Sequence, residues 1–167
     1  MFIRDASAAD LPRIVEIYNC AIPRRLATAD LEPVSVEDRM AWYSDHSPTT
    51  RPLWVIELEG NIAGWLSFQS FFSGRAAYDA TAEISIYLDP SFQRRGLGQK
   101  LLSQAISTGP ALGLNTLVAL IFAHNQPSLR LFSKFNFQRW GIVEPIGFDR
   151  FSQASSNCSF AACSKLY

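Results

Sequence analysis

The chain has 167 residues, of which 48% are hydrophobic and 18% charged, and its 15 basic and 15 acidic side chains cancel to a formal net charge of zero. This content is typical of a folded domain, and the neutral balance gives no overall attraction to nucleic acid or to an anionic membrane. No apolar run approaches the ~20 residues of a membrane span, and the start lacks a signal-peptide layout, so we expect a cytoplasmic protein. The length predicts one domain over residues 1–167. Residues 147–167 are expected to diverge in composition from the rest of this domain.

The first third of the chain predicts one strand and two helices. Residues 2–5 form a short apolar strand, and Ser7 and Asp10 then make a capping-box pattern in front of apolar residues at helical spacing. Ser35 and Asp38 repeat this pattern at the start of a second helix. The polar, proline-bounded segment between the two helices is expected to be a loop.

A β-hairpin and a further strand are predicted in the middle of the chain. Residues 52–72 contain two β-rich runs that meet at Glu59, Gly60 and Asn61, where the glycine and the asparagine can adopt positive φ. The next run alternates apolar and polar residues until Pro90 stops it.

The second half of the chain continues this alternation. Apolar residues recur at helical spacing from Gly98, and a strand over 116–122 follows. A helix over about 126–135 comes next, with Asn125 as its N-cap and Asn136 able to end it in the left-handed conformation. The order β-α-α-β-β-β-α-β-α predicts an α/β (α+β) fold whose sheet carries helices on both faces.

The cysteines and histidines do not indicate a metal or disulfide site. Cys20, Cys158 and Cys163 are odd in number and lack the C-x-x-C spacing of zinc sites, so three free thiols are expected. His46 and His124 each lie beside polar loop residues and are interpreted as structural. No metal ion is predicted.

A glycine-rich turn joins the middle strand to the helix that follows it. In QRRGLG, residues 93–98, Gly96 and Gly98 permit a close backbone approach at a helix N-terminus, where free N–H groups and the helix dipole favour anions. Arg94 and Arg95 add donors. An ordinary exposed turn is the alternative, and neither the dinucleotide fingerprint nor a Walker motif is present. The turn is interpreted as an anion-binding loop.

QRRGLG, the strand before it and the segment ALIFAHNQPSLRLFSKFNF after it resemble the GNAT superfamily of acyl-CoA N-acyltransferases, over roughly residues 2–143. That superfamily binds pyrophosphate with a Q/R-x-x-G-x-G/A loop. The resemblance implies a GNAT-like single domain with a mixed, mainly antiparallel sheet, acetyl-CoA as co-substrate, a β-bulge before the loop and an Asn near the pantetheine arm. The cofactor-binding residues it implies are Ile86, Tyr87, Leu88, Gln93, Arg94, Arg95, Gly96, Leu97, Gly98 and Asn125.

The segment GRAAYDATAEISIYL, with TADLEP, AWYSDH and GNIAGW upstream, further resembles the phosphinothricin and methionine sulfoximine acetyltransferase branch. This resemblance implies acetyl transfer to the amine of a small amino acid or an analogue of one. It makes Glu83 the catalytic base, which fits a carboxylate that takes the ammonium proton. It also makes Arg75 and Tyr78 substrate-binding residues, since a guanidinium can pair with a substrate carboxylate.

The sequence departs from the superfamily pattern at two places. Phe132 stands where many relatives carry a Tyr or His that protonates the leaving thiolate. Here water, Tyr87 or another group must donate that proton, or the thiolate leaves without protonation. The Ser-, Ala- and Cys-rich tail has a poor strand signal, and it is a divergent strand pair, a partly disordered segment or the product of an altered reading frame.

Alternative functions remain to be considered. A catalytically weak acyl-CoA-binding or regulatory module is the alternative to an enzyme. Binding of nucleic acid through Arg94 and Arg95 is disfavoured by the neutral charge and by the lack of an aromatic platform. We expect a small amino-acid-like substrate, no nucleic-acid or membrane partner, and either a monomer or a homodimer.

Overall fold

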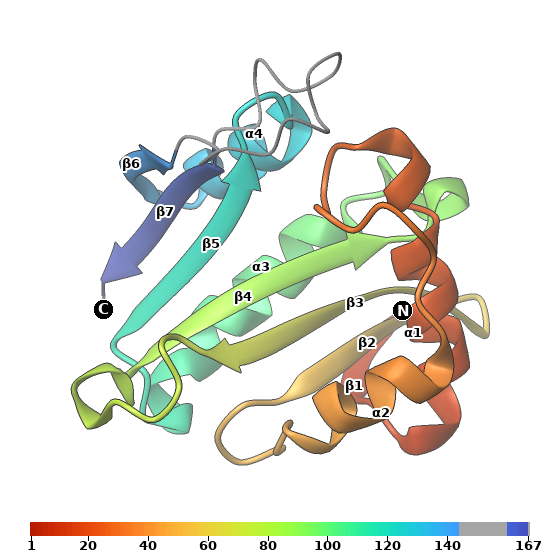
Figure 1. Cartoon of the computed structure of the whole chain (residues 1–167), viewed down its shortest axis with the longest axis horizontal. Helices are drawn as coiled ribbons and strands as arrows, with labels where there is room; N and C mark the ends of the chain where they lie inside the picture. Colours follow the sequence, from red (N-terminus) through yellow and green to blue (C-terminus); the bar gives the residue numbers. More distant parts are fainter. Residues whose placement is uncertain (144–159, 167) are drawn as a thin grey trace.

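The computed structural model describes residues 1–143 and 160–166 of the chain. Within these residues seven strands form one sheet in the order β1-β2-β3-β4-β5-β7-β6 (Figure 1). All neighbouring strands are antiparallel except β4 and β5, which confirms the mixed, mainly antiparallel sheet. The strands are β1 Phe2–Asp5, β2 Leu53–Leu58, β3 Asn61–Ser70, β4 Thr81–Leu88, β5 Thr116–Phe122, β6 Gln138–Val143 and β7 Phe160–Leu166.

Helices cover both faces of this sheet, as predicted. On one face, α1 (Leu11–Asn19) and α2 (Val36–Ser44) pack with β2 and β3 around Trp65. On the other, α3 (Leu97–Thr108) and α4 (Gln126–Lys134) bury their apolar sides on β3, β4 and β5. None of the helices among the described residues is long and apolar enough to cross a membrane.

Local capping signals account for where the first two helices begin. The side chains of Ser7 and Asp10 form the predicted capping box ahead of α1, and Arg4 pairs with the Asp10 carboxylate at 2.7 Å. Hydrogen bonds from the Arg4 side chain hold the pKa of Asp10 below its usual range. Ser35 and Asp38 form the second box, at the start of α2. Each box satisfies N–H groups that the helix itself cannot.

The turn between β2 and β3 differs from the prediction in one residue. Positive φ angles occur at Glu59 (55°) and Gly60 (77°), whereas Asn61 is already the first residue of β3 and pairs with Leu58. A two-residue hairpin loop of type I′ needs both of its residues in the left-handed region. Glu59, rather than Asn61, therefore adopts the left-handed conformation expected beside Gly60.

The last part of the chain completes the sheet. β7 lies between β5 and β6 and pairs with both, so residues 160–166 contribute a strand despite their weak alternation. The strand pair expected from the resemblance is thus present, but its first member is β6, which precedes the divergent segment. Residues 144–159, including Cys158, lie outside the described residues, and Cys20 is a free, exposed thiol.

Candidate active site

The strands β4 and β5 separate part-way along their length. Their parallel ladder joins only residues 81–83 to residues 116–118, and beyond it the two strands diverge (Figure 1). The gap holds a cavity lined by 84–87 of β4 and 119–122 of β5, with Asn125, the N-cap residue of α4 (Gln126–Lys134), and Phe132 on that helix beside it. A slot of this kind leaves one backbone edge of β4 free of a neighbouring strand, so an extended ligand can lie along it.

Glu83 lies at the point where the two strands separate. It is the last residue of β4 that pairs with β5, opposite Val118, and its partner on β3 is Gln69. The side chain is half-buried, and among the described residues no hydrogen bond or ion pair engages its carboxylate. Burial raises the pKa of Glu83 above its ordinary value. An unpaired carboxylate with a raised pKa, beside a cavity, is suited to accept a proton.

The N-terminus of α3 presents free backbone donors at the end of the slot. Gly96 is the N-cap residue, has φ 77° and offers no capping side chain, and the first helical hydrogen bond is Lys100 N to Gly96 O at 3.1 Å. The N–H groups of residues 97–99 therefore have no acceptor within the helix. Because a 12-residue helix directs its dipole at this end, the turn can hold a pyrophosphate, as the sequence predicts.

The side chains of the glycine-rich loop, residues 93–98, lie at the surface or contact neighbouring residues. Arg94 has φ 62° and is exposed, and Arg95 stacks over the ring of Phe92 at 5.3 Å while lying 4.0 Å from Glu59. Gln93 donates to Leu88 O at 3.4 Å, which ties the loop back to β4. Both guanidinium groups thus remain at the surface beside the α3 N-terminus, where an anion could recruit them.

Gly98 has a packing role that the sequence did not reveal. It is buried, and a Cβ at this position would lie 3.2 Å from Leu131 Cδ2 on α4 and 3.6 Å from Leu88 Cδ1. Gly96, by contrast, has nothing within 4 Å of such an atom. The second glycine of the motif therefore allows α3 to approach α4, whereas the first provides the left-handed turn.

The β-bulge implied for Ile86, Tyr87 and Leu88 is not present in the β3–β4 ladder. The register between residues 64–70 and residues 82–88 is continuous through all three positions. The backbone edge toward β5 is instead freed because the β4–β5 ladder ends at Glu83. The expected outcome, accessible main-chain groups along the slot, is reached by divergence of two strands rather than by an inserted residue.

The connection between α1 and α2 crosses the gap and is held from both sides. Tyr87 OH on β4 donates to Ala27 O at 2.7 Å, and Asn125 Nδ2 at the start of α4 donates to Leu26 O at 2.9 Å. His124 Nε2 lies 2.8 Å from Arg25 O. Three consecutive carbonyl groups of the connection are therefore fixed to β4 and to the segment that follows β5.

Asn125 consequently has two structural tasks in addition to its expected place near the pantetheine arm. Its Oδ1 accepts from Ser128 N as the N-cap of α4, while Nδ2 binds the carbonyl of Leu26. One N–H group and one oxygen lone pair remain for a ligand. Phe132, on the same helix, is buried in the core and can offer no proton.

Arg75 and Tyr78 lie in the exposed β3–β4 loop. Arg75 makes no side-chain hydrogen bond or ion pair among the described residues, and no contact brings it to Glu83. Tyr78 packs against Phe71 and Phe72, with ring centroids 5.9 and 5.3 Å away. The structure therefore leaves the guanidinium free but does not join it to the base.

Arg51 is a residue that the sequence reasoning missed. Its Nη2 donates to Asp79 O at 2.6 Å and to Thr81 O at 3.3 Å, so it ties the segment before β2 to the end of the β3–β4 loop and to the first residue of β4. Nothing in the sequence marks this arginine, because its acceptors are backbone carbonyls 28 and 30 residues away.

A second cavity, which the sequence did not indicate, lies between the sheet and the helices α1 and α2. Its volume is about 130 Å³. Aromatic side chains form much of its wall, and Tyr87 is stacked on Trp65 with centroids 4.6 Å apart. Ser85 and Tyr87 line both this cavity and the slot between β4 and β5. The two spaces are therefore neighbours, separated by these two residues, which follow Glu83 along β4.

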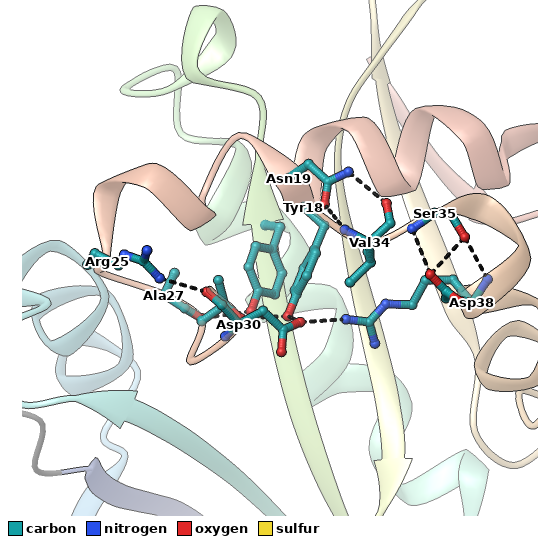
Figure 2. Close-up of polar contacts among 11 residues, drawn as sticks. Tyr18, Asn19, Arg25, Ala27, Asp30, Val34, Ser35 and Asp38 are labelled. Carbon is teal, nitrogen blue, oxygen red and sulfur yellow. Dashed lines mark hydrogen bonds and ion pairs between the residues drawn. The ribbon is translucent and has the colours of Figure 1, made fainter. Parts of the chain in front are cut away.

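A polar cluster borders this second cavity. Asp30 Oδ2 accepts from Tyr18 OH at 2.5 Å and from Arg39 Nη2 at 3.1 Å (Figure 2). The Arg39 guanidinium also lies over the Tyr18 ring, 4.5 Å from its centroid. Burial and the hydrogen bond to Asp30 raise the pKa of Tyr18. The cluster links α1, the connection and α2 around the opening.

Both histidines have structural contacts. The Nδ1 atom of His46 lies 2.8 Å from Trp42 O, and burial lowers the pKa of His46. His124 is stacked on Phe122, with ring centroids 5.3 Å apart. No three His, Cys, Asp or Glu side chains in the described ranges are grouped so that they could hold a metal ion.

Comparison with known proteins decides the family. The model of the acetyltransferase (GNAT) family matches residues 11–137. The chain belongs to the GNAT acetyltransferase family. This match spans the slot, the glycine-rich loop and Glu83, so the expected fold, family and N-acetyltransferase class are confirmed.

Individual relatives agree with this family over most of their length. YwnH of Bacillus subtilis is 50% identical over 147 residues, which cover 87% of this chain and 89% of that protein. An L-methionine sulfoximine/L-methionine sulfone acetyltransferase of Salmonella typhimurium is 36% identical over 149 residues, covering 88% and 85%. The crystal structure of a phosphinothricin acetyltransferase from Sinorhizobium meliloti in complex with acetyl-CoA has a TM-score of 0.87 at 28% identity, covering 99% and 87%.

Proposed function

We propose that the protein transfers an acetyl group from acetyl-CoA to the α-amine of a small amino acid or an analogue of one. The observation that carries this proposal is the half-buried, unpaired Glu83 at the point where β4 and β5 separate. The slot and the free N–H groups of α3 fit a long thiol cofactor with a pyrophosphate. The Sinorhizobium meliloti relative was crystallised with acetyl-CoA, which supports the same co-substrate here.

Each residue of the site has a distinct task in this reaction. Gln93, Arg94, Arg95, Gly96, Leu97 and Gly98 would hold the pyrophosphate, and the freed backbone of Ile86, Tyr87 and Leu88, with Asn125, would hold the pantetheine arm. When bound, acetyl-CoA supplies an acetyl thioester whose C–S bond breaks as the new C–N bond forms, giving the N-acetyl product and free coenzyme A.

Glu83 prepares the amine for this step. An ammonium group has no lone pair for attack, so Glu83 first accepts one of its protons, directly or through water. A second proton would leave the nitrogen to solvent as the amide forms, and the released thiolate would take up a proton from solvent. Because Phe132 cannot donate that proton and a thiol pKa near ~8.5 makes the thiolate a fair leaving group, we expect departure to need no protein acid.

The substrate class rests on the relatives and on the free guanidinium of Arg75. The Salmonella typhimurium relative is named for L-methionine sulfoximine and L-methionine sulfone, and both compounds carry an α-carboxylate. We infer that Arg75, with Tyr78, binds this carboxylate when substrate is present. We further propose that residues 1–167 act as one domain in the cytoplasm, with a homodimer as the assembly to examine by size-exclusion chromatography.

Thiol release measured with a panel of acceptors tests the proposal. Amino acids and their sulfoximine and phosphinate analogues should be acetylated, whereas the matching amines without an acid group should be poor acceptors. Arg75→Ala should remove most of this preference, by about one to two decades in kcat/KM, because one charge-assisted pair is lost. Equal activity of wild-type protein on decarboxylated amines would refute the substrate class.

The same assay separates the enzyme from the alternative of a catalytically weak acyl-CoA-binding module. That alternative is favoured by the identity of residue 132, because the phenyl ring of Phe132 has no proton to donate. Both functions predict binding of acetyl-CoA. Binding without thiol release for any acceptor would support the module and exclude the enzyme.

A further inference from the structure

Ser67 is a buried hydroxyl without a partner. The residue is 1% exposed, lies in the middle of β3 and lines the second cavity, and its Oγ makes no hydrogen bond within the part of the chain that the structure describes. Such a group destabilises the fold if nothing satisfies it. The side chains of its neighbours Gln69 and Ser85, in the same cavity, also make no hydrogen bond to a described residue. Three polar side chains are thus gathered with nothing in the protein to bind.

The position of this cavity relates it to the chemistry. Ser85 and Tyr87 separate it from the slot between β4 and β5. Gln69 is the cross-strand partner of Glu83, and Ser85 lies two residues further along the same face of β4. A molecule whose amine lies at Glu83 could therefore extend its side chain past Gln69 and Ser85 toward Ser67.

We propose that this cavity receives the side chain of the acceptor amino acid and that the Ser67 hydroxyl binds an uncharged polar group at the tip of that side chain. This inference rests on the proposed acetyl transfer to an amino acid. The cavity has a volume of about 130 Å³. This volume suits a short side chain, since an apolar cavity of about 150 Å³ can hold benzene.

The lining favours an uncharged tip over a charged one. Arg39 is the cationic side chain of the cavity wall, and its charge is already matched by Asp30 at 3.1 Å. The rings of Trp42 and Trp65 form apolar walls. A carboxylate moved into this space would lose its hydration without gaining a free counter-charge. Sulfone, sulfoximine and carboxamide groups accept hydrogen bonds and avoid this cost.

The test compares acceptors in the wild-type protein and in three variants. L-Methionine sulfone has the uncharged polar tip, L-methionine has the same chain without the oxygens, L-alanine is too short to enter the cavity, and L-glutamate has a charged tip. Ser67→Ala removes the hydroxyl and keeps the space, whereas Ser67→Val also removes the hydroxyl and narrows the space by a methyl group. Ser103→Ala, at an exposed position on α3, is the matched control.

Ser67→Ala should lower kcat/KM for methionine sulfone about 10-fold and that for methionine and alanine less than about twofold, because only the sulfone loses a hydrogen bond. Ser67→Val should lower kcat/KM for methionine sulfone and for methionine, and should leave kcat/KM for alanine unchanged. Ser103→Ala should change none of them. Wild-type protein should prefer the sulfone to glutamate by about 10-fold or more, because glutamate must desolvate its charge.

Two results would overturn the inference. In the first, Ser67→Ala and Ser67→Val change kcat/KM for methionine sulfone and for alanine by the same factor, which would place the cavity outside the acceptor site. Ser67→Ala could instead lower the melting temperature with unchanged selectivity, which would make the hydroxyl structural; an unchanged or higher melting temperature is expected. Failure of the proposed function itself looks different, because wild-type protein would then release no thiol with any of the four acceptors.

Discussion

Glu83 owes its chemical character to one position in the sheet. Its neighbours on β3 and β5 are Gln69 and Val118, neither of which carries a charge, so burial acts on the carboxylate without an opposing cation. Burial disfavours the charged form and raises the pKa of the group. A carboxylate with a raised pKa is a stronger base than that of an exposed glutamate.

Replacing Glu83 by glutamine keeps the shape and removes the base. We expect kcat/KM to fall by about 100-fold at pH 7, with binding of acetyl-CoA retained. Since Glu83 must be deprotonated to act, wild-type activity should be lost as pH falls through its raised pKa, and the variant should lack this acid limb. Raising the pH should partly rescue the variant, because more of the substrate amine is then neutral.

The pH profiles of kcat/KM for the two proteins, with calorimetric titration of acetyl-CoA, provide the measurement. The ionisation of the substrate amine is common to both proteins, so the difference between the profiles reports on Glu83. Full activity of the variant at pH 7, or an unchanged acid limb, would remove Glu83 from the mechanism.

At the scale of the element, the two glycines at the start of α3 have different functions. Gly96 has positive φ and open space around it, so Gly96→Ala should cost about 1–2 kcal/mol in stability and place a methyl group at the anion-binding turn. Gly98→Ala instead presses on Leu131 from 3.2 Å. We expect Gly96→Ala to weaken binding of acetyl-CoA about 10-fold and Gly98→Ala to affect mainly stability.

Urea unfolding and calorimetric titration of both variants distinguish these effects. Equal losses of stability with unequal losses of affinity would assign the cofactor contact to Gly96. Unchanged affinity in Gly96→Ala would contradict the anion-binding turn, whatever happens to stability.

The elements that were predicted correctly are those with short-range causes. The capping boxes at Ser35 and ahead of α1, the N-cap at Asn125 and the left-handed Asn136 all involve hydrogen bonds or backbone angles within a few residues. Such causes are visible in a single stretch of sequence. The hairpin was also predicted, but its turn was misassigned by one residue because Glu59 gives no sign that it will adopt positive φ.

The parts that could not be predicted depend on long-range contacts. Asn125 binds the carbonyl of Leu26, 99 residues earlier, and Arg51 binds carbonyls near the start of β4. Ser67 appears in the sequence as one alternating polar residue among several. Its isolation becomes visible only when β3, α1 and α2 enclose it. The strand β4 and the loop after it were therefore predictable from pattern and resemblance, whereas the second cavity was not.

At the scale of the molecule, the connection between α1 and α2 joins the two halves of the divided sheet. Its carbonyl groups at Ala27 and Leu26 are held by β4 and by the start of α4 respectively, across the slot. Its Asp30 also borders the second cavity through Arg39 and Tyr18 (Figure 2). The connection therefore contacts residues of the proposed cofactor slot and of the proposed acceptor cavity.

Tyr87→Phe tests this link, because it keeps the ring stacked on Trp65 and removes only the hydrogen bond to Ala27. Loss of one hydrogen bond of about 1 kcal/mol should open the connection locally, so that amide exchange across residues 25–34 becomes about fivefold faster while global unfolding changes little. Hydrogen exchange read by mass spectrometry supplies the measurement, with Tyr43→Phe on α2 as control, since no hydrogen bond from the Tyr43 hydroxyl is found among the described residues. Unchanged exchange in Tyr87→Phe would mean that Asn125 and His124 hold the connection without β4, and that its two sides are not coupled through Tyr87.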